Sequence, residues 1–198
     1  MSAAAGGPTD PEAFDRLRRR VLWSMPSGLF VVGSRAGDRR NLMTANWVVQ
    51  VATAPKLVAV AVEADSVTRG LIEAGGSFSV SVLARSDRGL VRRFVKPVRD
   101  IVTDRQGVAT ALQGEAVVEV ALGLPCLAAS LAWLACAVRT VIAWDGLVAD
   151  GPGEEEAGVA SHVLVVGEVV AAGETGRPAA PGDDAVLSMA DTRMNYGG

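Results

Sequence analysis

Asn41-Leu42-Met43-Thr44-Ala45-Asn46-Trp47 is the most informative segment of this sequence. It consists largely of small hydroxyl and amide side chains and is followed by apolar residues at 48–51. A second polar segment, Asp65-Ser66-Val67-Thr68, follows the apolar run 57–62 and opens a short helical pattern. The start of a helix carries free backbone N–H groups, to which a phosphate can bind. The second segment is therefore a candidate phosphate site beside a strand.

Length and composition favour one globular domain. The chain has 198 residues, of which 49% are hydrophobic and 21% are charged. These values suit a folded core rather than a disordered chain. The net charge of −3 and the pI near 5.2 give no case for nucleic acid, and local basic pairs such as Arg92-Arg93 are interpreted as solvated faces. We expect a disordered N-terminus over 1–9 and a single domain over 10–198.

Cysteine and histidine usage excludes two classes of site. Cys126 and Cys136 are the two cysteines, and His162 is the one histidine, which leaves too few ligands for a Cys/His zinc site and argues against a disulfide scaffold. Buried, reduced thiols are expected, and no metal. Residues 1–8 show neither the basic start nor the apolar segment of a signal peptide. A cytoplasmic protein is therefore expected.

An uncharged run from Val120 to Val138 reaches the length of a membrane span. Gly123-Leu124-Pro125 interrupts its start, and Arg139 leads directly into further apolar residues. Two buried strands joined by a turn fit this pattern better than a membrane helix. No membrane association is expected.

Local signals predict the secondary-structure elements. Asp10-Pro11-Glu12 marks a helix start, and Pro26-Ser27-Gly28 stops that helix. The turn at 36–38 predicts a hairpin between strands at 29–34 and 41–51. Alternating serines at 77–81 predict a half-exposed strand. Short helices are expected at 66–74 and 86–94, and later strands at 117–120, 127–138, 141–148 and 163–170.

Many strands, few helices and frequent turns predict a mainly β barrel with helical decoration. A doubly wound parallel sheet would need helices between successive strands in the second half, where the sequence predicts none. The chain also lacks a Gly-x-Gly-x-x-Gly motif after a strand, so a classical dinucleotide-binding fold is disfavoured.

The order of these motifs resembles the flavin reductase-like, FMN-binding split-barrel family. The resemblance implies a mainly β, split β-barrel with a few short helices. It also implies FMN as cofactor, with FAD possible, and NADH or NADPH as the electron donor. The matching segments are an opening strand at 26–32, a flavin-contacting strand at 41–55, a phosphate turn at 66–68, a strand at 78–83, a strand pair at 123–138 and a His-containing signature at 162–169.

The same resemblance assigns the flavin contacts. One edge of the flavin would meet the first polar segment, largely through backbone groups, and the phosphate would meet the second. The closing residues near 191–196 would also lie near the flavin. The residues so implied are Met43, Thr44, Ala45, Asn46, Trp47, Ser66, Thr68, Arg193 and Tyr196. Each has a plainer interpretation that stays open: β-edge polarity, a core or interface aromatic, or helix capping.

His162 is the catalytic candidate. A single histidine beside a strand is often structural, but its place in the matching signature implies a position near the flavin, where it would guide the nicotinamide or another substrate. Ala160-Ser161 stands where the family usually shows Gly-Asp. The change removes a carboxylate beside His162 and alters the partner available to its ring.

The resemblance implies an NAD(P)H-dependent flavin reductase, working as a homodimer and supplying reduced flavin to a partner monooxygenase. Hydride transfer needs no protein nucleophile, because the flavin carries the chemistry. Two alternatives remain. One is a flavin-bound electron carrier or pathway oxidoreductase acting on an organic substrate, and the other is a non-catalytic barrel scaffold without cofactor.

Overall fold

The computed structural model describes residues 10–143, 161–177 and 185–192. Its helices are α1 (Pro11–Trp23), α2 (Val67–Gly75) and the 3-10 helices η1 (Arg85–Phe94), η2 (Ala121–Gly123) and η3 (Met189–Asp191). Its strands are β1 (Phe30–Ala36), β2 (Arg39–Ala45), β3 (Val48–Thr53), β4 (Lys56–Glu63), β5 (Ser77–Val82), β6 (Ile101–Thr103), β7 (Ala109–Leu112), β8 (Glu115–Val120), β9 (Leu124–Leu127), β10 (Ala132–Ile142) and β11 (His162–Glu174). The predicted mainly β class is confirmed.

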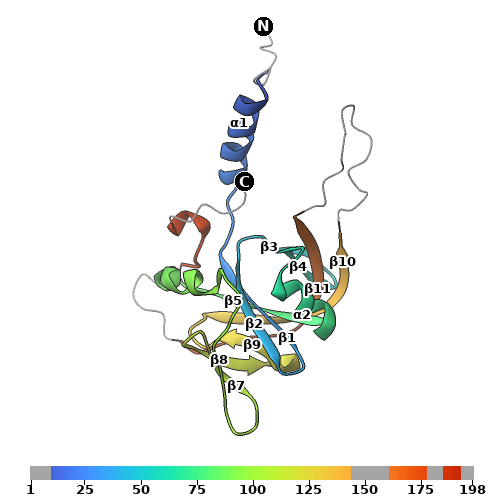
Figure 1. Cartoon of the computed structure of the whole chain (residues 1–198), viewed down its shortest axis with the longest axis vertical. Helices are drawn as coiled ribbons and strands as arrows, with labels where there is room; N and C mark the ends of the chain where they lie inside the picture. Colours follow the sequence, from blue (N-terminus) through green and yellow to red (C-terminus); the bar gives the residue numbers. More distant parts are fainter. Residues whose placement is uncertain (1–9, 144–160, 178–184, 193–198) are drawn as a thin grey trace.

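The strands form two antiparallel sheets (Figure 1). The larger has seven strands in the order β2-β1-β5-β10-β11-β4-β3, and the smaller has four in the order β6-β7-β8-β9. β2 and β3 stand at opposite ends of the larger order, yet only Asn46 and Trp47 separate them in sequence. Because two residues span only a few ångströms, this connection brings the two sheet edges together. The larger sheet is therefore curled toward a barrel whose seam lies at Asn46-Trp47.

The sequence prediction of one long strand over 41–51 is wrong at this seam. The β1–β2 hairpin forms as expected, with Phe30 opposite Ala45, but β3 pairs with β4 instead of β1. A continuous strand would keep all of these residues on one edge. The break lets the chain cross from one edge of the sheet to the other.

The serine face of β5 is buried rather than half-exposed, which corrects the alternation-based prediction. β9 lies over this face. The Ser79 hydroxyl donates to the Pro125 carbonyl at 2.6 Å, and the Leu127 amide donates to the Ser81 hydroxyl at 3.1 Å. Serine is tolerated inside the barrel because these hydroxyls meet backbone groups of the second sheet.

The uncharged run 120–138 forms strands rather than a membrane helix, as predicted, but the single strand expected over 127–138 is interrupted at 128–131, between β9 and β10. The predicted turn between 138 and 141 is absent. β10 continues to Ile142 and includes the charged Arg139 at a register irregularity. The side chain of Arg139 pairs with Glu168. The remainder of the predicted strand, 144–148, lies outside the described residues. No helix in the described part of the chain combines the length and apolar content of a membrane span.

Two buried clusters form the core. One gathers Phe94 and its neighbours between η1 and the smaller sheet, and the other surrounds Phe78 inside the larger sheet. Cys126 and Cys136 are both buried free thiols, as expected. Burial raises the pKa of Cys136 to about 12, so this thiol stays protonated at neutral pH.

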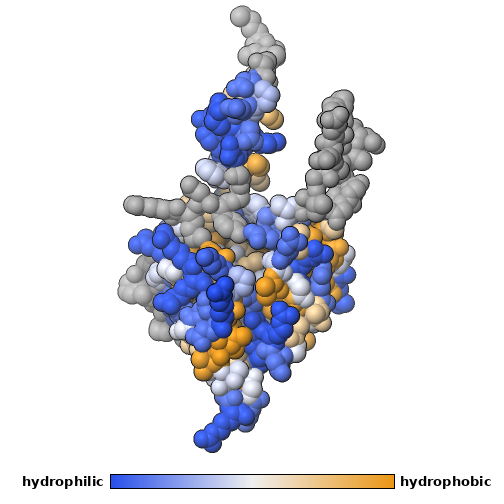
Figure 2. Space-filling view, viewed as in Figure 1, coloured by the Kyte–Doolittle hydropathy of each residue, from blue (hydrophilic) through white to orange (hydrophobic). Residues whose placement is uncertain are grey.

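α1 projects away from the barrel (Figure 1), and none of its residues is buried. Its start is as predicted, with the Asp10 carboxylate accepting from the Glu12 and Ala13 amides. Ion pairs join Glu12 to Arg16 and Asp15 to Arg19. Apolar residues are exposed on the helix and just after it (Figure 2): Phe14, Val21, Leu22, Trp23 and Met25.

Candidate functional site

The seam between β2 and β3 carries a nearly buried amide. Asn46 is 7% exposed, and its side chain makes no hydrogen bond to any other described residue. Its amide atoms are not among the enclosed side-chain atoms that lack a partner, so they reach the surface and can meet water or a ligand. Asn46 is therefore available for a ligand that comes to the seam.

Trp47 and His162 meet beside this amide. Their ring centroids are 5.0 Å apart with an interplanar angle of 68°, an edge-to-face contact. β4 brings them together: the Ala61 amide donates to the Trp47 carbonyl, and Glu63 lies opposite His162 in the sheet. Trp47 is 41% exposed, so part of its ring remains open to a ligand.

The ring of His162 is held by its chain neighbour. The Ser161 hydroxyl lies 2.8 Å from Nδ1 of His162, so Nε2 is the nitrogen left for other contacts. Ser161 itself is fixed, because its carbonyl accepts from the Ala64 amide at 2.9 Å. A hydroxyl thus occupies the position next to His162 in which the sequence analysis noted a missing carboxylate.

Ser66 lies at the start of α2, beside this group of residues. It caps the helix: its hydroxyl accepts from the Arg69 amide at 3.1 Å and donates to the Glu63 carbonyl at 2.8 Å. The side chain is half-buried. The structure therefore places Ser66 at the same end of the sheet as His162, with a capping role that does not exclude a ligand.

Thr68 is not brought to this surface. It is 1% exposed, and its hydroxyl accepts from Nδ2 of Asn41 at 2.9 Å. Asn41 in turn accepts from the Val98 amide at 2.8 Å. The predicted phosphate contact through this hydroxyl does not match the described geometry, because the group already joins α2 to β2.

The remaining residues of the first polar segment serve mainly in packing. Met43 and Ala45 lie against the core of the larger sheet. Thr44 is 8% exposed and donates to the Val91 carbonyl at 2.5 Å, which ties β2 to η1. β2 is an end strand, so one edge of its backbone lacks a strand partner. A ligand at this segment would meet backbone groups more readily than these side chains.

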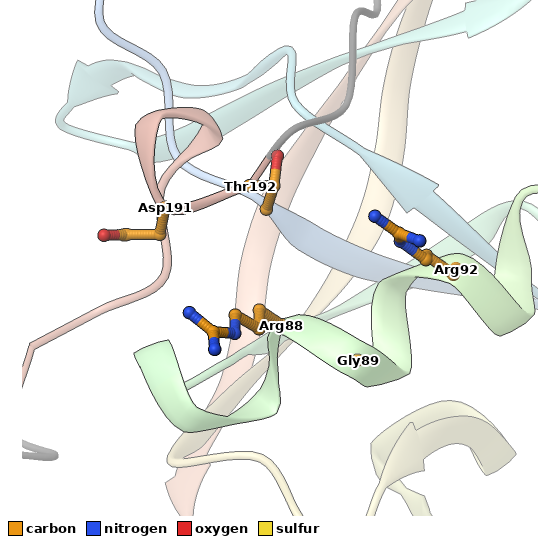
Figure 3. Close-up of a pocket in the computed structure, with 5 residues that line it drawn as sticks. All are labelled: Arg88, Gly89, Arg92, Asp191 and Thr192. Atoms are coloured by element: carbon orange, nitrogen blue, oxygen red, sulfur yellow. The ribbon is translucent and has the colours of Figure 1, made fainter.

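A cavity of about 400 Å³ opens between η1 and η3 (Figure 3). It is lined by Arg88, Gly89, Arg92, Asp191 and Thr192. Arg88 and Arg92 are both exposed. The sequence analysis named only Arg92, together with Arg93, and interpreted that pair as a solvated face. Arg193 and Tyr196, predicted near the flavin, lie outside the described residues, although the preceding Thr192 lines this cavity. The described residues contain no group of three or more potential metal ligands.

Comparison with known proteins identifies the family. A model of the flavin reductase like domain matches residues 22–196. The chain belongs to this family. The predicted recognition is thereby confirmed.

Named relatives support the assignment. The NADH-dependent FAD reductase of Streptomyces globisporus is 30% identical over 82% of this chain and 78% of its own. A solved NADH:FAD oxidoreductase from that organism has 26% identity and a TM-score of 0.59, covering 87% of this chain and 84% of its own. The flavin reductase component of a bacterial two-component tryptophan halogenase has 27% identity and a TM-score of 0.59, covering 82% and 89%. The fold is therefore the split barrel of flavin reductases.

Other relatives are much longer than this chain. A high molecular weight rubredoxin of Moorella thermoacetica is 36% identical over 66 residues, and the match spans 29% of its length. A putative diflavin flavoprotein of Nostoc is 28% identical over 122 residues, or 20% of its length. This chain therefore resembles one part of these larger proteins.

Proposed function

We propose that the protein is an NAD(P)H-dependent flavin reductase. The observation that carries the proposal is the family match over residues 22–196, and the relative named as an NADH-dependent FAD reductase supports it. The flavin is FMN or FAD, and the donor is NADH or NADPH. When bound, the flavin supplies the hydride-accepting chemistry, so the protein needs only to bind and orient.

The seam residues fit such a ligand. The free amide of Asn46 offers hydrogen bonds to a heteroaromatic edge, and the open part of the Trp47 ring offers a flat apolar surface. The backbone at 43–45 lies on the end strand β2, and we propose that it contacts the same edge of the flavin. At the start of α2, Ser66 is the contact that we propose for a flavin phosphate.

His162 positions the substrate in this proposal. Ser161 holds Nδ1, and the edge-to-face contact with Trp47 fixes the plane of the ring. Nε2 is then presented in one orientation to whatever binds over the seam. A ring held in this way can guide a nicotinamide without taking or giving a proton.

We further propose a homodimer that supplies reduced flavin to a flavin-dependent monooxygenase in the cytoplasm. The relative from the halogenase system is named as one component of a pair, which supports a separate oxygenase partner. Self-association is supported by β3, an end strand on which Val49 and Val51 are 59% and 50% exposed. Exposed apolar edge strands are normally covered. Light scattering on the purified protein tests the dimer.

Two measurements test the catalytic proposal. The absorbance spectrum of the purified protein, alone and after titration with FMN or FAD, reports flavin binding. Loss of NADH or NADPH absorbance in the presence of excess free flavin reports turnover. Repeated turnover supports the reductase. A colourless protein that binds neither flavin would support the scaffold alternative.

A second candidate is a flavin-bound electron carrier that exchanges electrons with a protein partner. The similarity to parts of a high molecular weight rubredoxin and of a diflavin flavoprotein favours it. Tight flavin binding without steady-state oxidation of NADH or NADPH would support this candidate over the reductase.

A further inference from the structure

The first turn of α2 carries an arginine whose side chain turns back to the end of β4. Arg69 is half-buried, with 32% of its side chain exposed. Its Nη1 donates to the Ala64 carbonyl at 2.8 Å, and its Nε donates to the Glu73 carboxylate at the same distance. The guanidinium thus joins the segment between β4 and α2 to the next turn of the helix.

Ala64 connects this arginine to the strand of His162. Its amide donates to the Ser161 carbonyl at 2.9 Å, and the Ser161 hydroxyl lies 2.8 Å from Nδ1 of His162. The same residue is therefore bonded through its carbonyl to Arg69 and through its amide to Ser161. Hydrogen bonds and the intervening backbone form a continuous connection from the guanidinium to the imidazole.

The members of this connection differ in how well they are otherwise held. Ser161 is exposed, so packing restrains it little, and its bond from the Ala64 amide is the restraint that the structure shows. The Ala64 side chain packs against the core of the larger sheet, and the bond from Arg69 fixes the direction of its carbonyl. Ser66 is held separately, because its hydroxyl bonds to the Glu63 carbonyl and to a backbone amide.

We propose that Arg69 is a positioning residue for His162: it fixes the Ala64 backbone, which holds Ser161 and thereby the plane of the imidazole. A guanidinium suits this role, because its donors point in fixed directions within one plane. The guanidinium is already bonded to a carbonyl and a carboxylate, so it is not assigned to a phosphate. That the imidazole guides a nicotinamide rests on the proposed function. The connection itself rests on the contacts.

Kinetics of two matched variants test this role. Arg69→Met keeps a good helix former with an apolar stem and removes every donor of the guanidinium. It should lower kcat/KM for NADH by about 3–10-fold, because His162 is less well oriented, and leave the affinities for FMN and FAD unchanged. Arg16→Met breaks the equivalent i,i+4 pair with Glu12 in α1, away from the barrel, and should change neither quantity. A weakened flavin affinity in Arg69→Met with an unchanged kcat/KM would overturn the proposal.

A double-mutant cycle shows whether the effect passes through His162. In the His162→Ala background, Arg69→Met should lower kcat/KM by less than about twofold, because the residue that Arg69 positions is gone. An equal fall in the wild-type and His162→Ala backgrounds would overturn the proposal, since the two residues would then act independently.

A second readout needs no turnover, because His162 is the one histidine of the chain. An NMR spectrum of the imidazole nitrogens therefore reports this ring alone. Its signals should shift in Arg69→Met, as they should in Ser161→Ala, and stay as in wild type in Arg16→Met. Unchanged signals in Arg69→Met overturn the proposal. If the signals shift as expected but wild type oxidises neither NADH nor NADPH, the reductase function is refuted and the positioning of the ring by Arg69 stands.

Discussion

The rings of Trp47 and His162 meet edge to face at 5.0 Å, although 115 positions separate them in the sequence. Trp47 directly precedes β3 and His162 begins β11, and β4 sets their approach because these two strands pair with its two edges. The contact joins the seam of the barrel to the one histidine of the chain. It gives the candidate site a flat aromatic wall with a fixed imidazole at its end.

Substitutions of His162 distinguish its packing against Trp47 from its proposed role in positioning the substrate. His162→Ala should lower kcat/KM for NADH by on the order of 10–100-fold, because substrate positioning is lost. Flavin affinity should be nearly unchanged, and stability should fall by only about 0.5–1.5 kcal/mol through loss of the ring contact. Steady-state kinetics and thermal denaturation measure these effects.

His162→Phe is the matched control, because it keeps a ring against Trp47 and removes both nitrogens. We expect its stability to be close to that of wild type and its kcat/KM to be as low as that of His162→Ala. Full activity in His162→Phe would show that the imidazole nitrogens play no part in the reaction.

Ser66 caps α2 and is also the proposed phosphate contact. Substitutions that keep the cap but differ in charge can distinguish these two roles. Asp and Asn both cap helices well, so Ser66→Asp and Ser66→Asn should each preserve stability to within about 0.5 kcal/mol. The added negative charge in Ser66→Asp should repel a phosphate and weaken flavin binding by about tenfold relative to Ser66→Asn. Flavin titration of both variants measures the difference. Equal flavin affinities of the two variants would show that the phosphate does not bind at the start of α2.

Local signals in the sequence account for the parts of the fold that depend on neighbouring residues. Asp10 and Ser66 cap the helices that they were expected to start, and the uncharged run 120–138 forms strands rather than a membrane helix. The number of strands and the frequency of turns predicted a barrel, and the family resemblance identified it as the split barrel. The order of the family's motifs along the chain was sufficient to identify this fold, because each motif falls on a separate strand or turn.

The features that the sequence did not predict arise where distant elements meet. The serine face of β5 has the pattern of an exposed face, and only the later strand β9 covers it. The break at Asn46-Trp47 depends on the strand order of the whole sheet. The cavity of Arg88 and Arg92 forms because η3 returns to η1 roughly a hundred positions later. No local pattern around either arginine contains this information.

Thr68 illustrates a site residue that the structure moves into the interior. Thr68→Val keeps the shape of the side chain and leaves Nδ2 of the buried Asn41 without its acceptor. The free energy of unfolding should fall by about 1–3 kcal/mol. Thr140→Val, at an exposed position on β10, should change it by less than about 0.5 kcal/mol. Chemical denaturation measures both, and Thr68→Ser should restore stability. A stable Thr68→Val variant with weakened flavin binding would instead support the predicted phosphate contact of Thr68.

Gly33, on β1, lies close to the backbone of β9 in the other sheet. A Cβ atom built on it would lie 2.0 Å from the Pro125 carbonyl oxygen and 2.3 Å from the Ser79 hydroxyl. The first of these is a backbone atom of β9, which cannot turn aside as a flexible side chain can. Gly33→Ala should therefore displace β9 and lower the free energy of unfolding by about 1–3 kcal/mol or more.

Gly70, inside α2, provides the matched control, because a Cβ atom there meets nothing within 4 Å. Gly70→Ala should raise the free energy of unfolding by about 0.4–1 kcal/mol, since alanine restricts the unfolded chain and favours the helix. Denaturant titration of the two variants should give shifts of opposite sign. Because Gly33 lies opposite Leu42 on β2, Gly33→Ala should also weaken flavin retention, whereas Gly70→Ala should not. A Gly33→Ala variant as stable as wild type would refute the tight apposition of β1 and β9.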